Sequence, residues 1–159
     1  MPENSAVRHP TLEHLDALVG TWETEATHHL LPDTTIHGRS TFAWLEGRQF
    51  LIWRSHFDHP DIPDSIAILG FDNAVEPSAV GAGTDPCAVH SFDSRGVHRV
   101  SRVEAGPGVW RVWRDWPGFS QRFTGTFSDD GDTITCPGEL SEDDATWKPD
   151  LHVTYTRVR

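Results

Sequence analysis

The sequence predicts an all-β protein, an antiparallel up-and-down β-barrel of about eight to ten strands with one short N-terminal helix. Apolar and polar residues alternate with a period of two from Thr21 to the end of the chain. Turn signals interrupt this alternation at short intervals, so strands adjacent in sequence are expected to pair. About ten such strands avoid open edges by closing into a barrel. At 159 residues the chain has the size of one domain, which we expect to span 1–159.

The helix is predicted near residues 11–18. Leu12, Leu15 and Leu18 recur at helical spacing, Pro10 precedes them and Gly20 follows as a stop signal. A helix of about two turns is marginal by itself. We therefore expect it to pack against one end of the barrel.

Ten segments carry the strand pattern. Between several of them lies a glycine-containing turn, as in Glu46-Gly47-Arg48 and Ser94-Arg95-Gly96, where glycine permits a positive φ. Residues 74–86 show no alternation and are predicted to form a surface loop at a barrel mouth. The predicted strands are 21–29, 35–45, 49–56, 65–71, 87–92, 97–104, 109–115, 120–128, 132–136 and 147–158.

Composition argues against several classes of partner. The net charge is −11 and Lys148 is the only lysine, so no basic surface is available for a nucleic-acid backbone. No apolar run approaches the roughly 20 residues of a membrane helix, and residues 1–10 lack the apolar core of a secretory signal. We therefore expect a cytoplasmic protein that binds neither nucleic acid nor membrane. A homodimer is left open.

Neither a metal nor an organic cofactor is expected. The segment His56-Phe57-Asp58-His59-Pro60-Asp61 places two histidines and two carboxylates close together, but its prolines indicate a solvated turn rather than a convergent ligand set. Cys87 and Cys136 lie far apart and belong to no zinc-binding pattern, so we expect two buried thiols. Phosphate-loop and dinucleotide fingerprints are missing from the sequence.

The two ends of the chain carry a family resemblance. Gly20-Thr21-Trp22 follows the predicted helix, and Arg157 lies near the end of the last strand. This arrangement resembles the calycin superfamily of lipocalins, fatty-acid-binding proteins and nitrobindins, in which a last-strand arginine covers the tryptophan of a first-strand Gly-x-Trp. The resemblance implies that Trp22 and Arg157 are structural residues in contact, a cation–π pair worth roughly 0.5–2 kcal/mol. Segments 92–97 and 119–131 are similar to a largely actinobacterial calycin-like group, a similarity that implies no particular activity.

Seven tryptophans are more than a short barrel needs for its core, and they predict an aromatic wall around a small ligand. We therefore expect the barrel interior to bind a small apolar or aromatic molecule. Polar residues on aromatic strands are expected to anchor it, although alternation alone does not decide which face lies inside. The candidate ligand-binding residues are Trp53, Arg54, His56, His90, Trp113, Gln121, Phe123 and Tyr155.

Two alternatives remain open from the sequence. A small barrel enzyme, a cyclase or isomerase acting on a hydrophobic natural-product-like intermediate, would use His56, His90 or Tyr155 as acid or base. Haem binding of the nitrobindin type is a weaker alternative, since nitrobindins use a histidine on a late strand and this chain has His152 there. Alternation with Arg157 predicts that His152 points outward, which argues against that alternative.

Overall fold

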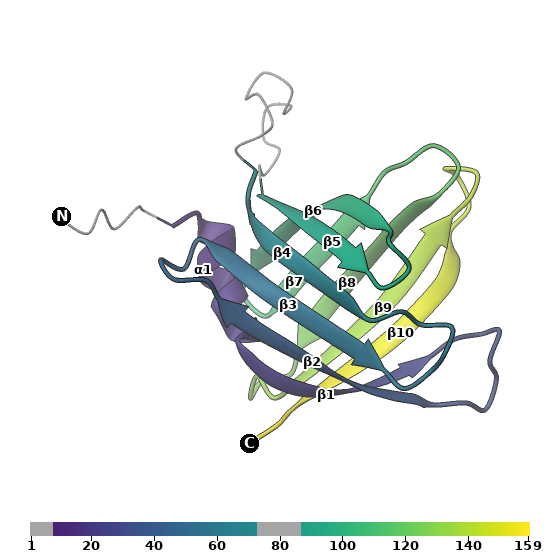
Figure 1. Cartoon of the computed structure of the whole chain (residues 1–159), viewed down its shortest axis with the longest axis horizontal. Coiled ribbons are helices and arrows are strands. Elements are labelled where there is room, and N and C mark those ends of the chain that lie inside the picture. The colour runs from purple at the N-terminus through teal and green to yellow at the C-terminus, as the bar shows by residue number, and fades with distance from the viewer. Residues whose placement is uncertain (1–7, 73–86) are drawn as a thin grey trace.

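A computed structural model describes residues 8–72 and 87–159 and confirms the predicted barrel (Figure 1). The strands close in the order β1-β10-β9-β8-β7-β6-β5-β4-β3-β2, and each neighbouring pair is antiparallel. The predicted loop 74–86 lies outside the described residues. The strands are β1 (Gly20–Thr27), β2 (Ile36–Trp44), β3 (Phe50–Phe57), β4 (Ser65–Phe71), β5 (Cys87–Asp93), β6 (His98–Gly106), β7 (Val109–Arg114), β8 (Ser120–Phe127), β9 (Thr133–Ser141) and β10 (Lys148–Arg157).

The predicted helix is present as α1 (Pro10–Leu15), followed by the short 3₁₀ helix η1 (Asp16–Leu18). Pro10 occupies the first turn, and the His9 side chain accepts a hydrogen bond from the Thr11 backbone N–H. Leu12 and Leu15 are almost fully buried. Helix α1 packs against β6 and lies over one end of the barrel (Figure 1).

At this closed end, Trp22 and Arg157 meet as the family resemblance implies. The Arg157 guanidinium carbon lies 4.2 Å from the centre of the Trp22 ring. The same guanidinium donates to the carbonyls of Ala17 (2.9 Å), Val19 (2.8 Å) and Gly131 (3.2 Å). Arg157 therefore connects β10 to two other parts of the chain: the segment between α1 and β1, and the β8–β9 turn.

Strand β9 is longer than predicted. The sequence prediction ends it at Cys136, before Pro137-Gly138, whereas the strand continues to Ser141. Pro137 lies opposite His152, and the register between β9 and β10 shifts between Pro149 and His152. This irregularity accommodates the proline within the ladder.

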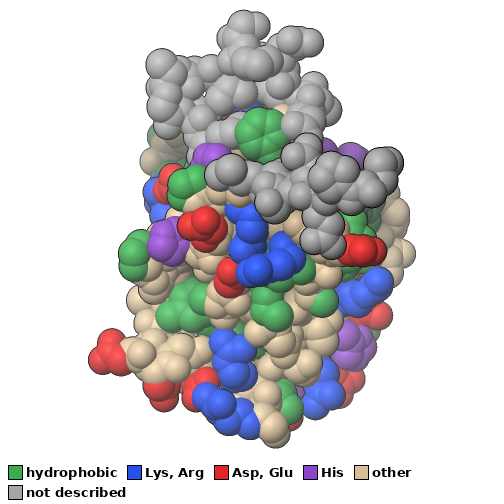
Figure 2. Space-filling view, turned by 90° about the vertical axis from the view of Figure 1, so that its left-hand side faces the viewer, with side chains coloured by type: hydrophobic (Ala, Val, Ile, Leu, Met, Phe, Trp, Pro, Cys, Tyr) green, Lys and Arg blue, Asp and Glu red, His purple; other side chains and the backbone are tan. Residues whose placement is uncertain are grey.

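Charged side chains of both signs are interspersed with small apolar patches on the face shown in Figure 2. Within residues 8–72 and 87–159, no helix is both long enough and apolar enough to span a bilayer.

Candidate functional site

The interior contains a cavity of about 330 Å³ in the half of the barrel away from α1. Residues from the β3–β4 connection, Ile62 and Pro63, border it together with inward side chains of most strands. Its volume falls within the range of roughly 300–1,000 Å³ that is usual for small-molecule sites. The geometry therefore provides room for a ligand of a few rings.

An aromatic cluster forms one wall of the cavity. Trp53 stacks on Phe42 at 5.2 Å and meets Trp110 and Phe123 edge-on at 5.4 Å and 6.3 Å between ring centres. Phe42 and Trp110 are buried behind this wall, whereas Trp53 and Phe123 line the cavity. The indole N–H of Trp53 is buried and has no hydrogen-bond partner among the described residues. Aliphatic side chains of Val89 and others complete the apolar lining.

A few polar side chains interrupt this apolar surface. Ser55, Ser91, Ser101 and Tyr155 all line the cavity. Tyr155 is only 3% exposed, and its burial raises the pKa of the phenol well above its ordinary value. The hydroxyl therefore stays protonated at neutral pH and can donate a hydrogen bond.

Cys136 also lines the cavity, and burial raises the pKa of its thiol to about 12. Cys87 and Cys136 are both buried as thiols. A thiol with a raised pKa is a poor nucleophile at neutral pH, so Cys136 contributes a small, weakly polar surface.

The cavity rim carries charge. Asp93 at the end of β5 and Asp150 on β10 both border it. Hydrogen bonds to Arg95, the largest cause, lower the pKa of the Asp93 carboxyl. Gln121 connects the rim, because its amide donates to Asp150 at 3.3 Å and its carbonyl accepts from Arg99 at 3.4 Å.

Five of the predicted residues lie at this site. Trp53, Gln121, Phe123 and Tyr155 line the cavity from strands β3, β8 and β10. Trp113 borders its edge, although it lies beside Arg111 on the other face of β7 from the buried Val112.

The prediction that Arg54, His56 and His90 face the interior is wrong. Trp53 points inward, so the alternation of β3 directs Arg54 outward, and Arg54 is exposed. His56 is 63% exposed and lies 2.6 Å from Asp64. His90 lies on the face of β5 opposite the cavity-lining Val89 and Ser91, and its ring stacks with that of His98 at 5.9 Å. Of the three acid–base candidates, only Tyr155 is in the cavity wall.

His152 is exposed on β10, as alternation predicts. Among the described residues, no group of three or more His, Cys, Asp or Glu side chains is placed to hold a metal ion.

Sequence reasoning missed several polar lining residues. Ser55 shares a face with Trp53, and Ser91 shares one with Val89, so strict alternation from a known inward residue finds both. Asp150 has no such signal, because it lies within the β9–β10 register shift.

Comparisons with solved structures show other proteins that share this fold. Rv2717c from M. tuberculosis matches with a TM-score of 0.60 and 13% identity, covering 96% of this chain and 100% of that one. The S-type phycobiliprotein lyase CPES from Guillardia theta matches with a TM-score of 0.56 and 9% identity, covering 96% of this chain and 94% of that one. No protein-family description and no curated protein matches the sequence. At these identities the comparisons show a shared fold.

Proposed function

We propose that this protein binds a small apolar or aromatic molecule inside the barrel. The observation that carries the proposal is the cavity of about 330 Å³, walled by Trp53 and Phe123 and interrupted by only a few polar groups. A concave, largely apolar site with a few polar anchors is the common form of a small-molecule site. Aromatic walls also favour flat ring systems, which gain from offset and edge-on contacts.

The polar groups of the cavity orient the ligand, whereas the apolar wall supplies most of the affinity. The protonated Tyr155 hydroxyl offers a donor deep in the cavity, while the serines offer weaker donors and acceptors nearer the rim. The buried N–H of Trp53 is unpaired among the described residues. An unsatisfied buried donor costs about 1–3 kcal/mol, so a ligand acceptor that reached it would recover part of that cost.

Binding is tested with N-phenyl-1-naphthylamine, a neutral fluorescent ring system without an ionisable group at pH 7. We expect saturable enhancement of its fluorescence and quenching of tryptophan emission, because Trp53 lies in the cavity wall. In Ser91→Phe a new ring points into the cavity, and affinity should fall by roughly tenfold or more.

The matched control is Ile68→Phe, which places the same ring on the outer face of β4, the strand beside β5, where Ile68 is 36% exposed. This variant should bind like the wild type. Urea unfolding of both variants establishes that they are folded. Unsaturable probe fluorescence, or equal affinity in folded Ser91→Phe and wild type, would contradict interior binding.

A further inference from the structure

The barrel wall has a gap between β6 and β7 at the same end as the cavity rim. The ladder of these strands runs from Gly106 opposite Val109 to Arg102 opposite Trp113, and the pairing stops there. Beyond it lies a second space of about 570 Å³. Ser101 and Trp113 border both spaces, so the gap adjoins the interior cavity.

Arginines gather at this gap without carboxylate partners. Most arginines among the described residues form an ion pair with an aspartate or glutamate, as Arg111 does with Glu104 at 2.7 Å. Within the described residues, those without such a pair are Arg54, Arg99, Arg102 and Arg114, and the last three line the gap. One terminal nitrogen of Arg102 is buried and has no hydrogen-bond partner in the described part of the chain.

Arg99 and Arg114 both contact Phe119. The guanidinium carbon of Arg99 lies 5.4 Å from the centre of the Phe119 ring, and Arg114 donates to the Phe119 carbonyl at 3.2 Å. Burial, followed by the neighbouring charge of Arg99, lowers the pKa of the Arg114 guanidinium. Two like charges held together without a counter-ion oppose each other, and an anion between them relieves that repulsion.

Four carboxylates border the two spaces, and within the described residues none of them forms an ion pair with Arg99 or Arg114: Asp72, Asp93, Asp115 and Asp150. Asp93 is held by Arg95 at 2.8 Å. Asp150 accepts from Gln121 and lies 3.7 Å from His28. In a chain of net charge −11, a group of guanidinium side chains without carboxylate partners beside an apolar cavity is a local exception.

We propose that the ligand of the interior cavity is an acid, whose apolar rings lie against Trp53 and Phe123 and whose single anionic group lies between Arg99 and Arg114. This inference rests on the proposed function. Gln121 connects the two parts, because it lines the cavity and contacts Arg99. The class of ligand is an aromatic or polycyclic monoanion carrying a carboxylate or sulfonate.

The test compares two probes that share one ring system. 1-Anilinonaphthalene-8-sulfonate carries an anionic group that N-phenyl-1-naphthylamine lacks. In the Arg99→Gln/Arg114→Gln double variant, we expect the sulfonate to bind roughly tenfold more weakly, since charge-assisted hydrogen bonds are lost. The neutral probe should bind with unchanged affinity. Added salt should weaken the sulfonate in the wild type and have less effect in the variant.

Two controls keep the result specific. Arg54→Gln removes one positive charge from the outer face of β3 and should leave both affinities unchanged. Arg99→Lys/Arg114→Lys keeps both charges and should restore most of the sulfonate affinity. It also provides a second readout if the glutamine variant is poorly folded.

The outcomes separate the two proposals. If the neutral probe binds and the sulfonate affinity is the same in wild type and the glutamine variant, the acid assignment is overturned while interior binding stands. An equal loss for both probes would also overturn it, because the arginines would then shape the cavity rather than hold an anion. If wild type binds neither probe, the proposed function itself fails.

Discussion

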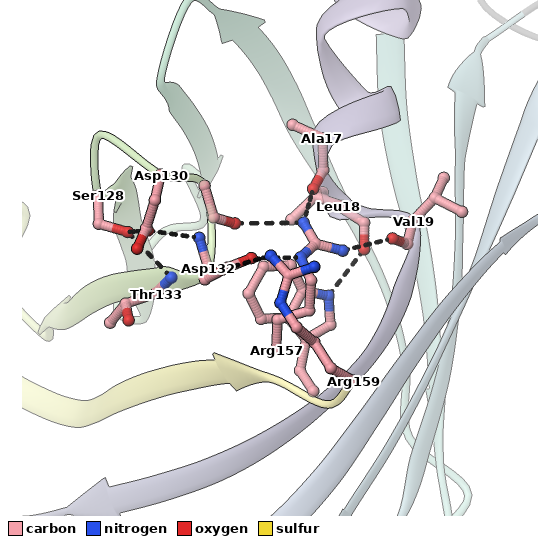
Figure 3. Close-up of polar contacts among 11 residues, drawn as sticks. Ala17, Leu18, Val19, Ser128, Asp130, Asp132, Thr133, Arg157 and Arg159 are labelled. Carbon is pink, nitrogen blue, oxygen red and sulfur yellow. Dashed lines mark hydrogen bonds and ion pairs between the residues drawn. The ribbon is translucent and has the colours of Figure 1, made fainter.

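The Arg157 side chain holds three separate chain segments at the closed end of the barrel. It lies over Trp22 and donates to backbone carbonyls before β1 and in the β8–β9 turn. Its Nε lies 3.3 Å from a carboxylate oxygen of Asp132 (Figure 3). The side chain is 22% exposed, so water competes only weakly for these contacts. The planar fork of arginine satisfies several acceptors at once, which a lysine ammonium at this position would not reproduce.

We therefore expect Arg157→Gln to lower the free energy of unfolding by about 2–4 kcal/mol, because carbonyls in a partly buried site lose a charged donor. Arg157→Lys should recover less than half of that loss. Urea unfolding followed by tryptophan fluorescence measures both. Arg159→Gln is the control, since Arg159 pairs with the same Asp132 but is 73% exposed. A stability of Arg157→Gln equal to that of this control would show that the contact is incidental.

At the level of strands, Gly125 on β8 makes room for the aromatic wall. It lies opposite Trp110 of β7. A Cβ atom added to Gly125 would lie 2.0 Å from the Trp110 indole nitrogen. Trp110 is 1% exposed and meets Trp53 and Phe123 at 5.4 Å and 5.0 Å between ring centres. A side chain at Gly125 would therefore displace the cluster behind the cavity.

Gly125→Ala is expected to lower the free energy of unfolding by about 1–3 kcal/mol, the usual cost of overpacking a core. Because Trp110 supports Trp53, the affinity for N-phenyl-1-naphthylamine should fall as well. Gly106→Ala is the matched control, since its nearest contact, Val109, would be at an ordinary 3.8 Å. Chemical denaturation measures the stability of the two variants, and probe titration measures their affinity. Equal stability and equal affinity in the two variants would refute this role for Gly125.

The positions of the strands could be predicted, because turn residues and alternation mark where each strand begins and ends. Which face of each strand points inward could not be predicted in this way. In β3 the run Leu51-Ile52-Trp53 is apolar on both faces, so alternation alone does not determine whether Trp53 or Arg54 points inward. The closed register settles it, because Trp53 lies opposite Phe42 on β2 and Ala67 on β4, both buried. Pairing between strands depends on residues far apart in the sequence. For this reason the orientations of Arg54 and of the residues of β5 could not be predicted from alternation within each strand.

For the whole molecule, stability at high pH depends on few groups. The chain has two cysteines and one tyrosine, and burial raises the pKa of Cys136 from 9.0 to about 12 and that of Tyr155 well above its ordinary value. Above pH 9 the unfolded chain releases the thiol proton while the folded chain retains it. The unfolded state then binds fewer protons, so the free energy of unfolding falls as the pH rises.

Between pH 8 and pH 10 we expect Cys136 to contribute a loss of about 1.4 kcal/mol, and Tyr155 should add to the loss above pH 10. Cys136→Ala should be less stable at pH 8 because it leaves a cavity, but its stability should decline less steeply with pH. Urea unfolding at both pH values, in a reducing buffer, gives the two slopes. Parallel declines in wild type and variant would show that the thiol does not control alkaline stability.

The pairing of β1 with β10 also orders the events of biosynthesis. Eight of the ten strands lie between β1 and β10 in the sequence, and these two strands close the barrel. The hydrogen bonds between Gly20–Thr27 and Lys148–Arg157 therefore form only after Lys148–Arg157 has left the ribosome. Until then the growing chain has a meander with two unpaired edges and an uncovered apolar face. Such edges are templates for intermolecular pairing, and closing the longest sequence separation last is slow. During synthesis, a chaperone or a neighbouring chain can therefore bind the unpaired edge of β1 before β10 does.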